Sequence, residues 1–188
     1  MTLLKMMVAI LLMTIITTTA FADPLKLKLA SPQPSDLKSG LAVKYAYPLD
    51  VKNLKQATRA LKYAEPGSPL AGLDYRDTAN GDLTLTSTQA HNVVAIISGY
   101  VNFDASGVYT IDFLTNDGLD ASIGGQQVGY FNGRQSCNET KPVQVEVPKA
   151  GWYELKAIYF QRVGSSCLHM RAGKGSPDWM PNSAFGYN

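Results

Sequence analysis

Alternating hydrophobic and polar positions in the second half of the chain predict short β-strands. The stretch VYTIDFL places Tyr109, Ile111 and Phe113 on one face and polar side chains on the other, because successive strand residues point to opposite faces. The same alternation, or a short apolar run, marks further predicted strands at 41–47, 82–88, 92–103, 143–147, 152–160 and 167–173. Residues 167–173 are expected to form the last strand. Short strands separated by glycine-rich turns indicate an all-β chain, an antiparallel sandwich or barrel.

Two turn-forming segments flank the VYTIDFL strand. DASG (104–107) precedes it directly and predicts a hairpin. Asn116, Asp117 and Gly118 follow it and predict another hairpin turn, in which glycine supplies a positive φ at no steric cost. A metal or sugar site is the alternative interpretation, because such a site would use both side-chain oxygens as well as the glycine. The residues alone leave both interpretations open.

One helix is expected, near the N-terminal side of the domain. Apolar residues recur at helical spacing between Val51 and Leu61. Asp50 is the predicted N-cap, and Pro66 with Gly67 is expected to end the run. The basic residues of this segment are interpreted as a solvated outer face.

The first 22 residues have the pattern of a secretory signal peptide. Lys5 precedes the apolar run MMVAILLMTII, and AFA (20–22) fits a cleavage site. This run is too short for a stable membrane span. We therefore expect a secreted or periplasmic protein with no membrane span. Residues 23–39, rich in Pro, Ser and Lys, are expected to be a linker or an N-terminal arm, and residues 40–188 the domain.

The charge balance argues against nucleic acid as a partner. The chain has 17 Lys and Arg and 15 Asp and Glu; without Lys5 of the leader the balance is 16 against 15. Binding to nucleic acid or anionic membrane requires a basic face. Catalytic patterns are also missing from the sequence: the two histidines, His91 and His169, are far apart, and neither an H-E-x-x-H nor a G-x-S-x-G motif occurs. We therefore predict that the protein is not an enzyme.

The two cysteines, Cys137 and Cys167, are expected to pair. An exported chain meets an oxidising compartment, where disulfides persist. A bridge across this 30-residue separation would stabilise the fold by roughly 3–4 kcal/mol through loop entropy. A redox-active pair is the weaker alternative, because no C-x-x-C motif is present.

Four segments occur in the order typical of one domain family. They are GLAVKYAY, ISGYVNFDASGVYTIDFLTNDGLDASIGGQQV, VPKAGWYELKAIYFQRVGSSCLHM and MPNSAFGYN, which together cover about residues 40–188. In this order they resemble the PA14 (anthrax protective-antigen) domain family. The resemblance implies a β-sandwich and a carbohydrate-related role, as in glycosidases, toxins and yeast adhesins. In the adhesin branch, two adjacent aspartates joined by a cis peptide hold a calcium ion that contacts sugar hydroxyls.

Carried onto this chain, the resemblance implies a metal site and a sugar site on one rim. The paired aspartates correspond to Asn116 and Asp117, and Gln161 lies near the position of an asparagine ligand. Calcium is thus the expected cofactor, weakly held, because only one of these ligands is a carboxylate. The candidate sugar ligands on the same rim are Tyr130, Asn132, Arg134 and Arg162. A Cys137–Cys167 bridge would hold the two loops of this rim against each other.

These observations predict a secreted or periplasmic, lectin-like module whose partner is a glycan or cell-surface polysaccharide. The alternative is a non-catalytic structural or protein-interaction module of the cell envelope, with an envelope protein as partner and a degenerate sugar site. Replacement of a carboxylate by Asn116 is compatible with this alternative.

Overall fold

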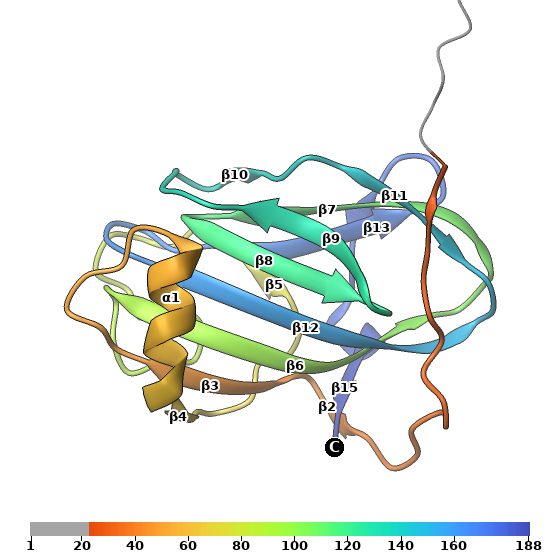
Figure 1. Ribbon diagram of the computed structural model, residues 1–188, viewed down its shortest axis with the longest axis horizontal. Coiled ribbons are helices and arrows are strands. Elements are labelled where there is room, and N and C mark those ends of the chain that lie inside the picture. Colours follow the sequence, from red (N-terminus) through yellow and green to blue (C-terminus); the bar gives the residue numbers. More distant parts are fainter. Residues whose placement is uncertain (1–22) are drawn as a thin grey trace, which may run out of the picture.

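A computed structural model describes residues 23–188, which form two β-sheets packed face to face (Figure 1). The predicted signal peptide, residues 1–22, lies outside the described residues. Within residues 23–188, no helix has the length and apolar character needed to cross a membrane.

The first sheet contains seven strands. Their bounds are β1 Leu25–Lys26, β5 Asp74–Tyr75, β7 Gly107–Thr115, β10 Asn138–Glu139, β11 Val143–Val147, β13 Leu168–Gly173 and β14 Asp178–Trp179. The order is β1-β11-β7-β13-β14, with β10 beside β7 and β5 beside β13. Only the β1–β11 pair of this sheet is parallel among the described strands.

The second sheet contains eight strands. Their bounds are β2 Lys38–Ser39, β3 Ala42–Ala46, β4 Glu65–Pro66, β6 Val93–Phe103, β8 Gly118–Ile123, β9 Gln126–Phe131, β12 Gly151–Gln161 and β15 Phe185–Tyr187. The order is β2-β15-β6-β12-β8-β9, and β3 pairs with both β4 and β6. The predicted antiparallel β-sandwich is therefore confirmed.

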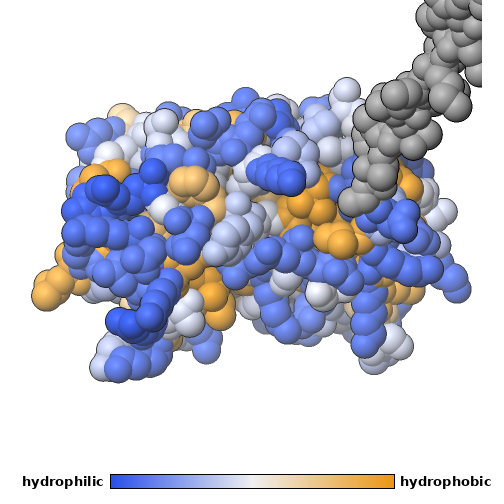
Figure 2. Space-filling view, turned by 45° about the horizontal axis from the view of Figure 1, so that its top comes forward, coloured by the Kyte–Doolittle hydropathy of each residue, from blue (hydrophilic) through white to orange (hydrophobic). Residues whose placement is uncertain are grey.

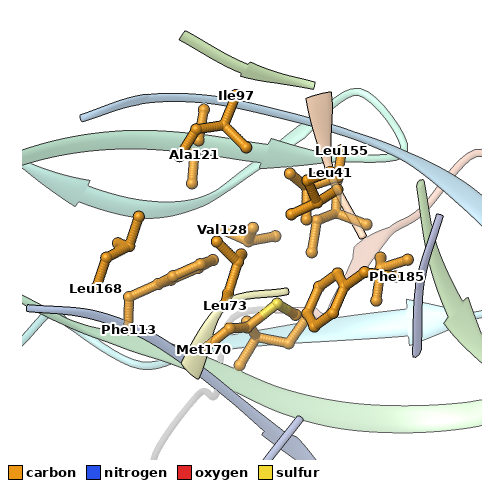
Figure 3. Packing of buried hydrophobic residues seen from close by; sticks show 14 of the residues in the cluster. Leu41, Leu73, Ile97, Phe113, Ala121, Val128, Leu155, Leu168, Met170 and Phe185 are labelled. Atoms are coloured by element: carbon orange, nitrogen blue, oxygen red, sulfur yellow. The ribbon is translucent and has the colours of Figure 1, made fainter. Parts of the chain in front are cut away.

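The core lies between the two sheets and follows the predicted alternation. Phe113, Leu168 and Met170 project from the first sheet toward Ile97, Ala121 and Leu155 of the second (Figure 3). All six of these side chains are almost completely buried. Their removal from water supplies the main force that holds the sheets together.

The turns on either side of β7 are not hairpins, contrary to the sequence prediction. Strand β7 belongs to the first sheet, whereas β6 and β8 belong to the second, so both connections cross the sandwich. A two-residue hairpin instead joins β8 to β9 through Gly124 and Gly125, whose φ values of +54° and +81° suit such a turn. The same turn-forming residues occur in hairpins within one sheet and in connections between two sheets. The local sequence therefore did not distinguish a hairpin from a connection that crosses the sandwich.

The predicted helix is present as α1, Leu54–Ala60, followed by the 3₁₀ turn η1, Leu61–Tyr63. Its N-cap is Asn53, whose side-chain oxygen accepts the Gln56 N–H at 3.0 Å, and the prediction of Asp50 was wrong. Asp50 instead forms ion pairs outside the helix.

Residues 82–88 do not form the predicted strand. Leu83 is 56% exposed, whereas Thr84 is fully buried. The Thr84 hydroxyl donates a hydrogen bond to the Ala90 carbonyl at 2.7 Å, which stabilises a turn. The Leu–Thr alternation was therefore misleading: a strand would bury leucine and expose threonine, whereas here the reverse holds at positions 83 and 84. A threonine hydroxyl that is hydrogen-bonded to nearby backbone can be buried.

Both ends of the described chain are built into the sandwich. In the segment 23–39, β1 pairs with β11, Leu27 is buried, and β2 pairs with β15. At the other end, β14, the 3₁₀ turn η2 (Asn182–Ala184) and β15 follow β13. Strand β13 is thus not the last strand as predicted. The later strands are only two and three residues long, too short to show a hydrophobic period.

Candidate functional site

Three loops meet at the end of the sandwich where β7 passes into β8, on the left in Figure 1. They are the corner 116–117, the loop 132–137 and the loop 162–167. The Asn116 N–H donates to the Cys167 carbonyl at 3.1 Å, and the Asp117 N–H donates to the Gln135 carbonyl at 3.0 Å. Backbone hydrogen bonds therefore tie the corner to both neighbouring loops. We call this end of the molecule the rim.

The predicted disulfide links the two outer loops of the rim. Cys137 and Cys167 are bonded, with their Cα atoms 5.8 Å apart. Cys167 is fully buried, and its carbonyl is the acceptor of the Asn116 N–H. The bridge thus holds the backbone on both sides of the corner.

Asp117, rather than the glycine after it, has the left-handed backbone conformation, with φ of +59°. Aspartate tolerates this region better than most residues. Gly118 has no positive φ; a Cβ there would lie 2.0 Å from Cε1 of Phe160. The prediction that Gly118 supplies a positive φ was therefore wrong: the glycine makes room for an aromatic ring.

The Asp117 carboxylate is held by the third loop. Its Oδ2 accepts the Arg162 N–H at 2.7 Å, and the residue is only 4% exposed. Burial raises the pKa of Asp117 above its ordinary value, because it disfavours the charged form; the hydrogen bond from the Arg162 N–H and the positive charge of Arg134 partly oppose this. The site therefore contains one buried carboxyl that is close to two arginines, Arg134 and Arg162.

A hollow of about 380 Å³ opens at the rim. It is lined by Asn116, Asp117, Arg134, Gln135, Ser136, Arg162, Val163, Gly164 and Ser165. The structure thus brings together four predicted site residues, Asn116, Asp117, Arg134 and Arg162. We call this hollow the rim pocket. The same end of the molecule is mainly hydrophilic in the surface view (Figure 2).

The other three predicted site residues, Tyr130, Asn132 and Gln161, lie outside the lining of the rim pocket. Tyr130 is half exposed on β9, opposite Asp120. The Asn132 side-chain oxygen accepts the Leu54 N–H at 2.8 Å, so it connects the loop to the start of α1.

Gln161 supports the 162–167 loop from inside. It is fully buried, and its amide donates to the carbonyls of Val163 at 2.9 Å and Ser165 at 2.6 Å. Its own oxygen accepts the Tyr159 hydroxyl at 3.3 Å. Both the oxygen and the nitrogen of the Gln161 side-chain amide are therefore hydrogen-bonded within the protein.

These residues do not fit a calcium site of the adhesin type. Calcium takes six to eight oxygen ligands, and its affinity rises with the number of carboxylates. The rim pocket has one carboxylate, Asp117, together with the cationic side chains of Arg134 and Arg162. In residues 23–188 the only cis peptide precedes Pro32, so the Asn116–Asp117 bond is trans. Nowhere in this range do three His, Cys, Asp or Glu side chains form a potential metal cluster.

Asp50 is a site residue that the sequence analysis missed. Its Oδ1 accepts Nε of Arg162 at 2.8 Å, and its Oδ2 lies 2.8 Å from Nζ of Lys52. The loop before α1 thereby fixes the Arg162 side chain at the rim. No local signal revealed this role, since the two residues are 112 positions apart.

Comparison with known proteins gives the family. A model of the PA14 domain matches residues 71–184. No curated protein matches the chain.

Solved structures share the fold at low sequence identity. The PA14 domain of the antifreeze protein MpAFP has a TM-score of 0.67 and 16% identity, over 82% of this chain and 93% of that one. A PA14 sugar-binding domain from an RTX adhesin has a TM-score of 0.65 and 16% identity, over 80% and 99%. The epithelial adhesin 9 A domain from Candida glabrata, solved in complex with Galb1-3GlcNAc, has a TM-score of 0.63 and 15% identity, over 87% and 94%.

Proposed function

Because the chain belongs to the PA14 domain family, we propose that it is a non-catalytic glycan-binding module that works outside the cytoplasm. The observation that carries this proposal is the rim pocket, which gathers Asn116, Asp117, Arg134 and Arg162 from three loops. Of the three similar structures named above, one is a sugar-binding domain and another was solved in complex with Galb1-3GlcNAc. The disulfide agrees with an oxidising compartment.

The pocket offers the hydrogen-bonding groups that a sugar ring requires. Asp117 can accept a hydroxyl proton, and the Asn116 amide, whose hydrogen bond to Ser165 is long at 3.5 Å, can exchange that partner for a sugar oxygen. The loops are ordered beforehand by the disulfide and by backbone hydrogen bonds. Such preorganisation lowers the entropic cost of binding.

We further propose that binding at the rim pocket does not need calcium. The cation in this position would face two guanidinium groups, and Gln161 would have to give up its bonds to the loop to reach it. Calorimetric titration of residues 23–188 with calcium should therefore give no saturable heat up to millimolar concentration. Saturable heat that is lost in Asp117→Ala would contradict this part of the proposal.

The glycan-binding proposal is tested on a glycan array that contains neutral and anionic sugars, with residues 23–188. Asp117→Ala should abolish binding, because it removes the one carboxylate among the residues that line the pocket. The matched control is Asp104→Ala, an exposed carboxylate at the β6–β7 corner at the opposite end of β7. Binding should survive in the control. Asp117→Ala should stay folded but lose about 1–3 kcal/mol of stability, because the Arg162 N–H loses its acceptor, so binding by both variants is measured well below their unfolding midpoints.

Absence of binding to every glycan, with a folded protein, would overturn the proposal. If crosslinking of this protein in cells that produce it then recovered one envelope protein, that result would favour a protein-interaction module. Equal binding by the unmodified protein and Asp117→Ala would place the sugar elsewhere on the surface.

A further inference from the structure

The rim pocket carries an excess of positive charge. Arg134, Arg162 and Asp117 line the pocket, and Asp50 and Lys52 lie beside it, next to Arg162. Three positive charges are therefore opposed by two negative ones. Asp50 lies between Lys52 and Arg162 and contacts both, so its charge is already shared. The residues that line the pocket itself include two arginines and a single acidic residue.

Arg134 is available to a ligand. Its side chain is exposed and forms no ion pair or hydrogen bond with the part of the chain that the structure describes. It lies close enough to Asp117 to influence that carboxyl, yet the two do not form an ion pair within residues 23–188. The Arg134 guanidinium thus has its full set of donors free for a ligand of the pocket that this residue lines.

Arg162 is held in place with donors to spare. Its Nε is fixed by Asp50 at 2.8 Å, and its side chain is only 25% exposed. Among the described residues, its two terminal nitrogens have no hydrogen-bond partner. A guanidinium anchored at one edge presents its other edge to a planar anion, the geometry that carboxylates and related groups favour.

We propose that the rim pocket recognises the anionic group of an acidic sugar, a carboxylate or a sulfate ester, through Arg134 and Arg162. This inference rests on the proposed glycan-binding function and names the class of glycan. Asp117 then accepts a hydrogen bond from a hydroxyl group of the same sugar ring. The pocket would thus bind the acidic group and a hydroxyl group of one sugar.

The probes are polysaccharides matched in backbone. Galacturonan is compared with its fully methyl-esterified form, and dextran sulfate with dextran, in 150 mM salt with chelator present. We expect binding to galacturonan, to dextran sulfate or to both, with at least about ten-fold weaker binding to the corresponding neutral polymer. The pair that responds distinguishes carboxylate from sulfate.

The variant is Arg134→Gln, which removes the charge and keeps a polar side chain of similar reach. It should weaken binding to the anionic polymer about ten-fold or more and reduce the salt dependence of binding. The matched control is Arg59→Gln, an exposed arginine in the last turn of α1 and outside the rim pocket. It should change the affinity less than two-fold.

Three results would overturn the inference. Equal binding of neutral and anionic partners would refute anion recognition and leave glycan binding intact. An equal loss in Arg59→Gln would show unspecific attraction to positive charge. Absence of binding to all four polymers and to the neutral and anionic glycans of the array would refute the glycan-binding function, and this inference with it.

Discussion

Gly118 is predicted to be indispensable because of Phe160 and not because of backbone conformation. In Gly118→Ala the new Cβ would lie 2.0 Å from Cε1 of the Phe160 ring and within 2.8 Å of two further ring atoms. Carbon atoms in contact prefer about 3.5–4.0 Å. The ring would therefore have to move by about 1.5 Å, given that contact distance.

The surroundings of Phe160 make this movement costly. The ring is fully buried in a second apolar cluster with Leu54 and Ala57 of α1 and with Val94. Overpacking a core costs about 1–3 kcal/mol, and the upper end applies here because a Cβ cannot rotate away. Loss of glycine's unfolded-state entropy returns about 0.4–1 kcal/mol. We expect a net loss of about 2–2.5 kcal/mol in the free energy of unfolding.

The assay is urea unfolding of residues 23–188 followed by intrinsic fluorescence. The control is Gly133→Ala, where a Cβ would meet only Phe131 at 3.3 Å and where φ is not positive; it should change stability by less than about 0.5 kcal/mol. Adding Phe160→Leu to Gly118→Ala should recover at least about 1 kcal/mol relative to additivity. A loss below about 1 kcal/mol for Gly118→Ala, or the same loss with Leu at position 160, would refute the reasoning.

Three further predictions concern the rim. Replacing Cys137 and Cys167 by serine should lower the free energy of unfolding by about 3–4 kcal/mol, measured by urea unfolding; a loss below about 1 kcal/mol would argue against the loop-entropy account. Asn132→Ala should cost about 1 kcal/mol, because the Leu54 N–H loses its acceptor, and should leave glycan affinity unchanged; a large affinity loss would return Asn132 to the binding residues. Asp117→Asn should be more stable than the unmodified protein at pH 7. Because the pKa of Asp117 is raised, the folded state favours its protonated form. The stability difference between Asp117→Asn and the unmodified protein should therefore shrink as the pH falls through the raised pKa and vanish below the ordinary value. Thermal melts across pH 3–7 measure this difference, and one that grows on acidification would contradict the prediction.

The central strands and their core faces were predictable because alternation is a local property. Tyr109, Ile111 and Phe113 face the core as predicted, and the inward row of β12 does the same. A strand with one buried face repeats every two residues wherever it lies in the fold. The disulfide was predictable too, since the chain has two cysteines and each has only the other as an intramolecular partner.

The family resemblance located the corner at Asn116 and Asp117 and the second loop of the rim, but not what these residues do there. Gln161 was expected beside a ligand, and its side chain instead holds the carbonyls of Val163 and Ser165. Motif spacing places a residue on a loop; side-chain direction depends on what packs beneath that loop.

Alternation along the chain was sufficient for the central strands β6, β7 and β12, their apolar faces and the all-β class, because these depend on neighbours within a few residues; it was misleading at 82–88 and did not reveal β8 and β9. Three-dimensional contacts assigned β7 and β8 to different sheets, brought Asp50 to Arg162 and placed Phe160 against Gly118. Each of these arrangements involves segments that share no local sequence pattern. Which segments become neighbours depends on how the two sheets pack. The chemistry of the rim pocket, two arginines around one carboxylate, is for the same reason a property of the folded chain.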